Sequence, residues 1–242
     1  MSYFKNFPDV FYQFGNEKSI ELFQNISLYI DIIDQIKNNY AFYQTYYIQQ
    51  NERPDQLSMR LYDTPEYHWT FYLMNDTIRE RGWPLSNKEI IERCIKDYPH
   101  LVITTRDSLN GIFKIGTQVT GKRSGATGTI AHRTLDLGQI HLENVNGTFI
   151  AGEILNWTNE RNLIDTITSY SIGEEYLSAH HYEDAEGNHV DIDPYVGPGA
   201  QLTEITYLDR HIALNNQLKS IRVIKPGAID DVVSAFNEAL RS

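Results

Sequence analysis

Residues 46–75 read YYIQQNERPDQLSMRLYDTPEYHWTFYLMN, and this stretch carries the strongest structural signals in the chain. It opens within an aromatic and β-branched run, residues 41–49, which is typical of a β-strand. Polar residues follow this run up to Pro54. The stretch therefore predicts a strand that ends before Pro54.

Two short helices are predicted after this strand. Proline is favourable at the first position of a helix, and after Pro54 apolar residues recur every three to four positions, at Leu57, Leu61 and Tyr62. The sequence Asp63-Thr64-Pro65 ends this helix. A second helix is predicted over residues 65–75, with Trp69, Tyr72 and Leu73 on one face.

The segment before this unit has a different pattern. Between residues 20 and 32 its apolar residues fall on even positions, and this period of two predicts extended structure. These residues are Ile20, Leu22, Ile26, Leu28, Ile30 and Ile32.

Short β-prone runs follow one another beyond residue 111. Hairpin signals separate them at Ser124-Gly125, Asp136-Leu137-Gly138 and Asn146-Gly147. Strands at this spacing are typical of a small antiparallel barrel or sandwich. The predicted strands are residues 112–120, 127–132, 139–143 and 148–155.

The last third of the chain mixes strands and helices. Residues 177–183 and 189–193 predict a hairpin around the turn 184–188, and PYVGPG at 194–199 predicts a loop. A helix over 207–218, a strand over 220–224 and a terminal helix from Pro226 follow.

These elements predict an α+β protein in three parts. The parts are an N-terminal region (1–111), an inserted small β-barrel or sandwich module (112–165), and a C-terminal region of hairpin, strand and terminal helix (166–242).

Composition limits the class of partner. The formal net charge is −11 and no run of basic residues occurs, so we expect no nucleic-acid partner. No apolar run reaches the 18 residues typical of a membrane-spanning helix, so we expect no membrane partner either. Cys94 is the only cysteine, which excludes an internal disulfide framework. The 16 tyrosines and 10 phenylalanines favour contact surfaces.

Two motifs resemble a nucleotide-binding loop and a metal site, but neither matches such a site fully. Residues 116–123 read GTQVTGKR, which matches a phosphate loop except that Arg123 replaces the hydroxyl residue that binds Mg²⁺. A second cluster of imidazoles and carboxylates could bind a metal ion, but adjacent histidines on one strand point to opposite faces. A solvated hairpin is the preferred interpretation of this cluster, which comprises His180, His181, Glu183, Asp184, Glu186, His189, Asp191 and Asp193.

The sequence contains no Gly-x-Ser-x-Gly elbow and no His-Glu-x-x-His motif. We therefore predict that the chain is not an enzyme, with no catalytic residues, no cofactor and no metal ligand.

Motifs between residues 43 and 98 resemble those of the baseplate wedge protein 53 family of T-even-like contractile-tail phages. The motifs run in order along the chain, and further similarity near the C-terminus includes Asn215 and residues 221–226. In the first segment they are Tyr46-Tyr47-Ile48, Glu52-Arg53-Pro54-Asp55, Leu61-Tyr62, Tyr67-His68-Trp69, Leu73-Met74-Asn75 and Trp83-Pro84-Leu85-Ser86.

The resemblance implies a LysM-like βααβ core at about 43–98 and a structural function. The protein would join wedge components and fasten wedges around the central hub, in the tail baseplate of a virion assembled in the host bacterial cytoplasm. Its implied partners are the wedge-ring protein, the sheath-initiator protein and the central hub or spike complex. The alternative is a LysM-type glycan-binding module, and a metal-dependent hydrolase using the 180–193 cluster ranks below both.

Consecutive aromatic residues on the second predicted helix must point in several directions. We expect Trp69 to lie in the core of the domain, because it aligns with Leu73. We expect Phe71, about 200° away from Trp69 on the helix, to face a partner protein. Tyr67, Tyr72 and Trp83 are the other predicted interface residues.

Overall fold

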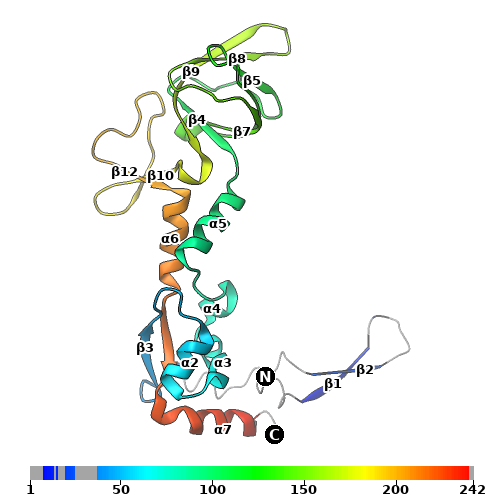
Figure 1. Cartoon of the computed structure of the whole chain (residues 1–242), viewed down its shortest axis with the longest axis vertical. Coiled ribbons are helices and arrows are strands. Elements are labelled where there is room, and N and C mark those ends of the chain that lie inside the picture. The colour runs from blue at the N-terminus through cyan, green and yellow to red at the C-terminus, as the bar shows by residue number, and fades with distance from the viewer. Residues whose placement is uncertain (1–7, 14, 16–19, 25–36, 240–242) are drawn as a thin grey trace. The chain divides into compact units, whose positions relative to one another are not determined.

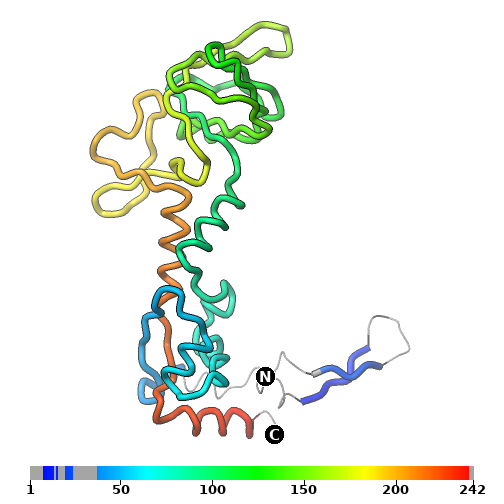
Figure 2. Tube along the Cα trace, in the orientation of Figure 1, coloured from blue at the N-terminus to red at the C-terminus, as the bar shows by residue number. Residues whose placement is uncertain are grey.

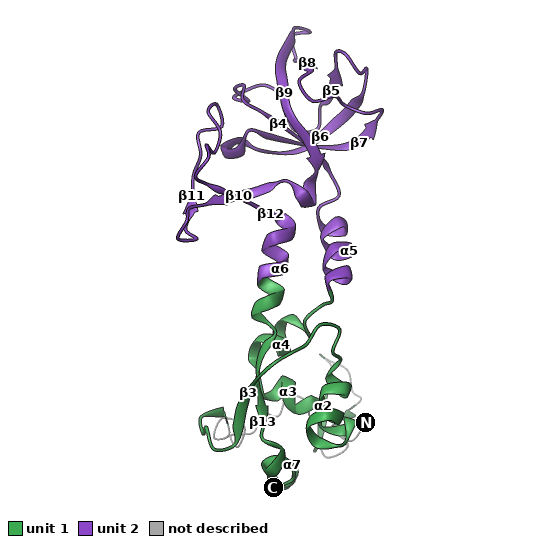
Figure 3. Ribbon diagram, turned by 60° about the vertical axis from the view of Figure 1, so that its left-hand side comes forward, with its two compact units in different colours: residues 1–86, 214–242 green, residues 87–213 purple. Residues whose placement is uncertain are grey.

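The computed structural model describes residues 8–13, 15, 20–24 and 37–239. It has both helices and sheets, which confirms the α+β class (Figure 1). The chain forms two compact units, unit 1 from residues 1–86 and 214–242 and unit 2 from residues 87–213 (Figure 3). Unit 2 is thus an insertion in the sequence of unit 1. None of the helices in the described ranges is long and apolar enough to cross a membrane.

Unit 1 contains the predicted strand, both predicted helices and the C-terminal elements. Asp63 ends the first helix in the left-handed conformation, at φ 57°. The second predicted helix is split, because its first turn is a 3₁₀ helix. The elements are β3 (Tyr43–Tyr47), α2 (Pro54–Tyr62), η2 (Pro65–Tyr67), α3 (Trp69–Met74), α4 (Asp76–Arg81), β13 (Ser220–Ile224), η5 (Pro226–Ala228) and α7 (Ile229–Ala239).

Strand β3 pairs antiparallel with β13, with Tyr46 opposite Ile221. Figure 2 shows these two segments side by side, although they lie near opposite ends of the chain. The partner strand of β3 therefore lies outside the predicted core at 43–98 and comes from beyond unit 2. The reason is local: residues 76–98 form helices α4 and α5 (Asn87–Asp97).

Two apolar clusters fill unit 1. Both consist only of residues from this unit, and α3 contributes Phe71 to the first cluster and Met74 to the second. The first contains Ile48, Leu57, Phe71, Ile78, Leu218, Ile221 and Val223. The second contains Tyr43, Met74, Ile224, Ile229 and Val232.

A second pair of short strands lies near the N-terminus. Strand β1 (Asp9–Tyr12) pairs antiparallel with β2 (Glu21–Gln24), with Phe11 opposite Leu22. The extended structure predicted for residues 20–32 is therefore seen at β2, and residues 25–32 lie outside the described residues.

Unit 2 is built around a closed six-stranded barrel, in the order β4-β7-β6-β5-β8-β9. It is larger than the predicted module at 112–165, because a strand from before that module and an extended strand at its end complete it. The strands are β4 (Leu101–Thr105), β5 (Gln118–Gly121), β6 (Thr127–Thr134), β7 (Gln139–Asn146), β8 (Ile154–Thr158) and β9 (Ile164–Glu174).

A three-stranded sheet and helix α6 (Tyr207–Gln217) follow the barrel. Strand β10 (Ala179–Glu183) lies between β11 (His189–Val190) and β12 (Thr203–Thr206), and the predicted hairpin corresponds to β10 and β11. Helix α6 begins in unit 2 and ends in unit 1.

The chain leaves unit 1 and returns to it at neighbouring points. Asn215 is buried, and its side-chain oxygen accepts a hydrogen bond from Leu85 N at 2.7 Å. Its amide nitrogen donates to Leu85 O at 3.0 Å. These reciprocal bonds hold residues 85 and 215 together.

Replacing residues 87–213 with a short Gly/Ser linker should leave unit 1 folded, because both of its apolar clusters stay intact and residues 85 and 215 are adjacent. Urea unfolding followed by circular dichroism should then show one cooperative transition. Deleting only residues 112–157 removes β5, β6, β7 and nearly all of β8, and should unfold the barrel. An unfolded linker protein would contradict this division of the chain.

Candidate functional site

Phe71 is fully buried, at 0% exposure, in the first cluster of unit 1. Its ring stacks on Tyr62 at 6.0 Å and lies 6.0 Å from the ring of Trp83. The expectation that Phe71 faces a partner protein is therefore wrong. The reason is that α3 is covered on more than one side, so a residue opposite Trp69 still lies in the core of the unit.

Trp69 packs within unit 1 but is only partly buried and belongs to neither apolar cluster, so the expectation that it lies in the core holds only in part. It contacts Phe236 of the terminal helix, with ring centres 5.0 Å apart. Tyr67 is also partly buried, and its hydroxyl donates to Asp230 at 3.0 Å. Burial and then the neighbouring Asp230 carboxylate raise the pKa of Tyr67.

Tyr72 and Trp83 lie together at the surface of unit 1. Both are partly buried, and their rings are 6.0 Å apart. Trp83 Nε1 donates to Glu52 O at 2.7 Å, which fixes the indole in place. Tyr67, Tyr72 and Trp83 are thus the predicted interface residues that remain partly exposed to solvent.

The β1–β2 pair exposes large apolar side chains. Phe11 is 76% exposed and Leu22 is 56% exposed, and the two are directly opposite across the strands. An isolated two-stranded sheet is only marginally stable in water. Exposed apolar patches of this kind often mark contacts with other proteins.

The phosphate-loop look-alike binds a carboxylate of its own chain. Glu153 is 4% exposed and accepts hydrogen bonds from Arg123 N at 3.0 Å and Ser124 N at 2.9 Å. Ser124 Oγ and Ile150 N also donate to it, both at 2.8 Å. The amides of Arg123 and Ser124, at the end of the loop, are therefore already bonded to Glu153. Backbone oxygens accept hydrogen bonds from the amides of Gly116, Thr117, Gly121 and Lys122.

Gly121 makes room for this carboxylate, because a Cβ atom there would lie 2.3 Å from Ser124 Oγ and 2.7 Å from Glu153 Oε1. Burial alone would raise the pKa of Glu153, but the hydrogen bonds from Ile150, Ser124 and Arg123 lower it overall. Glu153 is thus held as an anion inside the loop.

The predicted cluster at 180–193 is a hairpin with local contacts. A register shift between Ala179 and His181 brings the Nδ1 atoms of His180 and His181 to 2.9 Å, so these side chains do not simply point to opposite faces. His181 Nε2 lies 3.0 Å from Glu183 Oε1. Asp184 accepts from the turn amides of Glu186 and Asn188.

A different histidine cluster surrounds Glu175, at the end of the barrel. His100 Nδ1 lies 2.6 Å from Glu175 Oε2, while His132 Nε2 and His141 Nδ1 lie 3.1 and 3.0 Å from Oε1. This site was not predicted from the sequence, because its residues come from four separate segments of the chain. His132 and His141 are the exception, because they lie close together in the sequence and are paired across the β6–β7 hairpin.

Glu175 is 2% exposed and remains charged. Burial would raise its pKa, but the imidazole of His141 and the backbone and side chain of His100 lower it to about 2. The pKa of His132 is lowered by burial and by the neighbouring His141. Burial therefore favours the neutral form of the His132 imidazole beside a carboxylate that is held as an anion.

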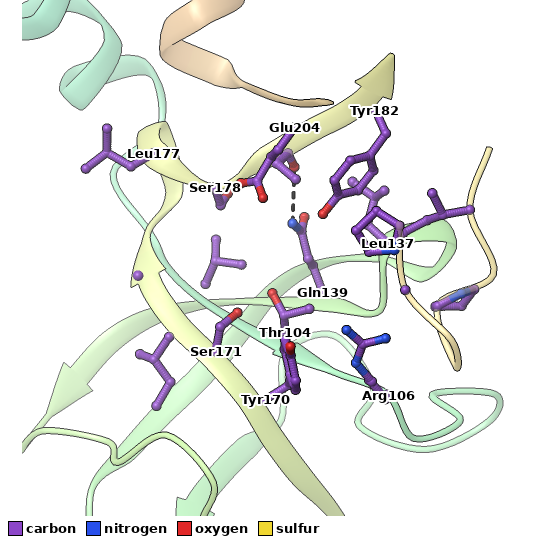
Figure 4. Close-up of a pocket in the computed structure, with 18 residues that line it drawn as sticks. Thr104, Arg106, Leu137, Gln139, Tyr170, Ser171, Leu177, Ser178, Tyr182 and Glu204 are labelled. Carbon is purple, nitrogen blue, oxygen red and sulfur yellow. Dashed lines mark hydrogen bonds between the residues drawn. The ribbon is translucent and has the colours of Figure 1, made fainter. Parts of the chain in front are cut away.

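A pocket of about 450 Å³ lies in unit 2, beside β4 and β9. Figure 4 shows Gln139 and Thr104 pointing from the barrel wall toward Glu204 and Tyr182. Gln139 Nε2 donates to Ala179 O at 3.1 Å, while its buried Oε1 has no hydrogen-bond partner among the described residues. Among the residues that the structure describes, those lining the pocket include no histidine or cysteine.

Residues 9–107 match the family described as base plate wedge protein 53. This match confirms the resemblance drawn from residues 43–98. It indicates a structural role in a phage baseplate and a location in the virion tail, and it favours the expectation that the chain is not an enzyme. No curated protein matches the chain.

Phe71→Ala should lower the free energy of unfolding by about 3–5 kcal/mol, because it removes a fully buried ring from the core of unit 1. Trp69→Ala should cost less, since its ring is partly exposed. Urea unfolding of both variants measures the difference. A larger loss for Trp69→Ala would show that the terminal helix, and not the first cluster, dominates the stability of unit 1.

Glu153→Gln should lower the free energy of unfolding by about 1–3 kcal/mol at neutral pH, because it weakens several hydrogen bonds to a buried anion. The pKa of Glu153 is lowered in the folded state, so its contribution is fully present above the unfolded pKa of about 4.3 and is lost as pH falls below it.

Urea unfolding of the wild type and Glu153→Gln between neutral pH and pH ~3 tests this expectation. Exposed Glu143 on β7 provides the control, Glu143→Gln. Identical pH profiles for the two variants would show that the loop does not depend on the charge of Glu153.

Proposed function

We propose that this chain, whose residues 9–107 belong to the base plate wedge protein 53 family, is a structural subunit that joins wedge components of a phage tail baseplate. It would fasten wedges around the central hub, through contacts with the wedge-ring protein, the sheath-initiator protein and the hub or spike complex. The virion would be assembled in the host bacterial cytoplasm. The family match carries this proposal.

The exposed face of the β1–β2 pair supports an assembly function. Phe11 and Leu22 lie within the matched residues and form an apolar cross-strand pair that is open to solvent. Burial of this pair by a neighbouring subunit would stabilise both the strands and the contact. We propose this pair as a contact surface, together with the exposed parts of Tyr67, Tyr72 and Trp83.

The order of elements in unit 1 supports the proposed LysM-like core. Strand β3 and helices α2 and α3 are followed in unit 1 by helix α4 and strand β13, so the unit contains the βααβ order with one added helix, and the two strands pair antiparallel. In this proposal the second strand is separated from the helices by the whole of unit 2. We assign to this core the role of a scaffold that presents contact surfaces, because folds of this type serve unrelated functions.

The double variant Phe11→Ser and Leu22→Ser should leave the unfolding curve of the isolated chain unchanged, because both side chains are exposed. Its incorporation into baseplates should fall at least about tenfold, which corresponds to losing about 1.4 kcal/mol of contact energy. Sedimentation of assembling baseplates, followed by quantification of the bound chain, measures this effect.

The matched control is Leu163→Ser with Ile164→Ser, which removes two comparably exposed apolar side chains from the barrel, at 60% and 64% exposure. This control should assemble normally. Normal incorporation of the Phe11 and Leu22 variant would contradict the proposed contact surface.

A further inference from the structure

Three donor atoms converge at the end of the barrel in unit 2. One donor atom from each of His100, His132 and Glu175 lies within 4.8 Å of the other two. Ligands bound tetrahedrally to zinc at about 2.0–2.1 Å are roughly 3.4 Å apart. Glu175 Oε1 lies 3.1 Å from His132 Nε2 and Oε2 lies 2.6 Å from His100 Nδ1, and each distance is within about 1 Å of that spacing.

The orientation of the three imidazole rings indicates which two histidines could bind the same ion. The ring centres of His100 and His132 are 5.2 Å apart with planes at 81°. Two imidazoles that bind one tetrahedral ion have ring centres roughly 5 Å apart. The rings of His132 and His141 are stacked, with centres 3.7 Å apart and planes at 22°, which is too close for both to bind the same ion.

His141 packs against two of these residues, because its ring stacks on His132 and its Nδ1 lies near Glu175. It is fully buried at 0% exposure, and its Nε2 lies 3.2 Å from Thr134 Oγ1. Its Nδ1 is 3.0 Å from Glu175 Oε1 but has no partner in hydrogen-bond geometry among the described residues. A small rotation of the carboxylate toward an ion would complete this bond, and hydrogen-bonded carboxylates are usual around metals.

The backbone holds two of the donors in place. Glu175 N donates to His100 O at 2.9 Å, and His100 N donates to Glu175 Oε2 at 3.1 Å. The side chain of His132 is 41% exposed, so the site is open to water on that side. A fourth ligand can therefore be water.

We propose that His100, His132 and Glu175 bind a divalent transition-metal ion of the zinc class, with His141 orienting the carboxylate. Two imidazoles and a carboxylate are ligands that suit zinc. The ion would join the segment before β4, strand β6 and the turn after β9, and so would stabilise the closed barrel. This site differs from the cluster at 180–193, and it replaces the expectation from sequence that the chain holds no metal ligand.

The test uses the full chain without a polyhistidine tag, loaded with ZnCl₂ and dialysed against metal-free buffer. Three proteins are compared: the wild type, His132→Ala and His189→Ala. His132→Ala removes a partly exposed ligand and should fold. His189→Ala is the matched control, because His189 is 63% exposed and belongs to the other histidine cluster. Elemental analysis gives the metal content, and melting with and without ZnCl₂ gives the effect on stability.

The wild type and His189→Ala should retain about one zinc ion per chain, and ZnCl₂ should raise their melting temperatures. His132→Ala should bind zinc at least about tenfold more weakly, with no rise in melting temperature. Co²⁺ bound to the wild type should show the intense visible absorption of a four-coordinate site, and His132→Ala should lack it. Loss of zinc during dialysis of the wild type, or loss only in His189→Ala, would overturn the proposal.

Discussion

The pairing of β3 with β13 is the constraint on which unit 1 depends. Tyr46 lies opposite Ile221, and both apolar clusters of the unit include residues from the region of β13. The N-terminal half of the unit therefore cannot complete its core until the C-terminal end of the chain arrives. Loop-closure entropy grows only slowly with loop length, and folding of unit 2 shortens the effective loop because residues 85 and 215 come together. We infer that the barrel, whose core lies wholly within unit 2, can form first.

Local signals predicted many elements but few of their tertiary partners. The helix that begins at Pro54, the strand Ser220–Ile224 and the terminal helix were all evident from proline positions and apolar spacing. The partner of β3 was not evident, because strand pairing between distant segments leaves no mark in either one. For the same reason the barrel was predicted without Leu101–Thr105, its first strand. Phe71 was misassigned because helical spacing shows which way a side chain points, but not which sides of the helix are covered by the rest of the protein.

The candidate sites show a similar limit. Glu153 and Glu175 are both buried carboxylates, and each is surrounded by donors from distant parts of the chain. We assign no phosphate to the phosphate-loop look-alike, but the amides at its end, Arg123 N and Ser124 N, donate to an anion. The sequence did not reveal that the anion is the chain's own side chain, about 30 residues further on. The three histidines around Glu175 were not predicted as one site, because His100, the His132–His141 pair and Glu175 come from segments far apart in the chain.

Unit 2 is attached to unit 1 by two segments of the chain, and this has a mechanical consequence. A force applied to unit 2 reaches unit 1 through two covalent connections, at residues 86 and 214, and not through a single linker. Both connections adjoin the paired hydrogen bonds between Leu85 and Asn215. These two bonds hold the ends of the inserted segment together inside unit 1, so the chain leaves and re-enters the unit at one place.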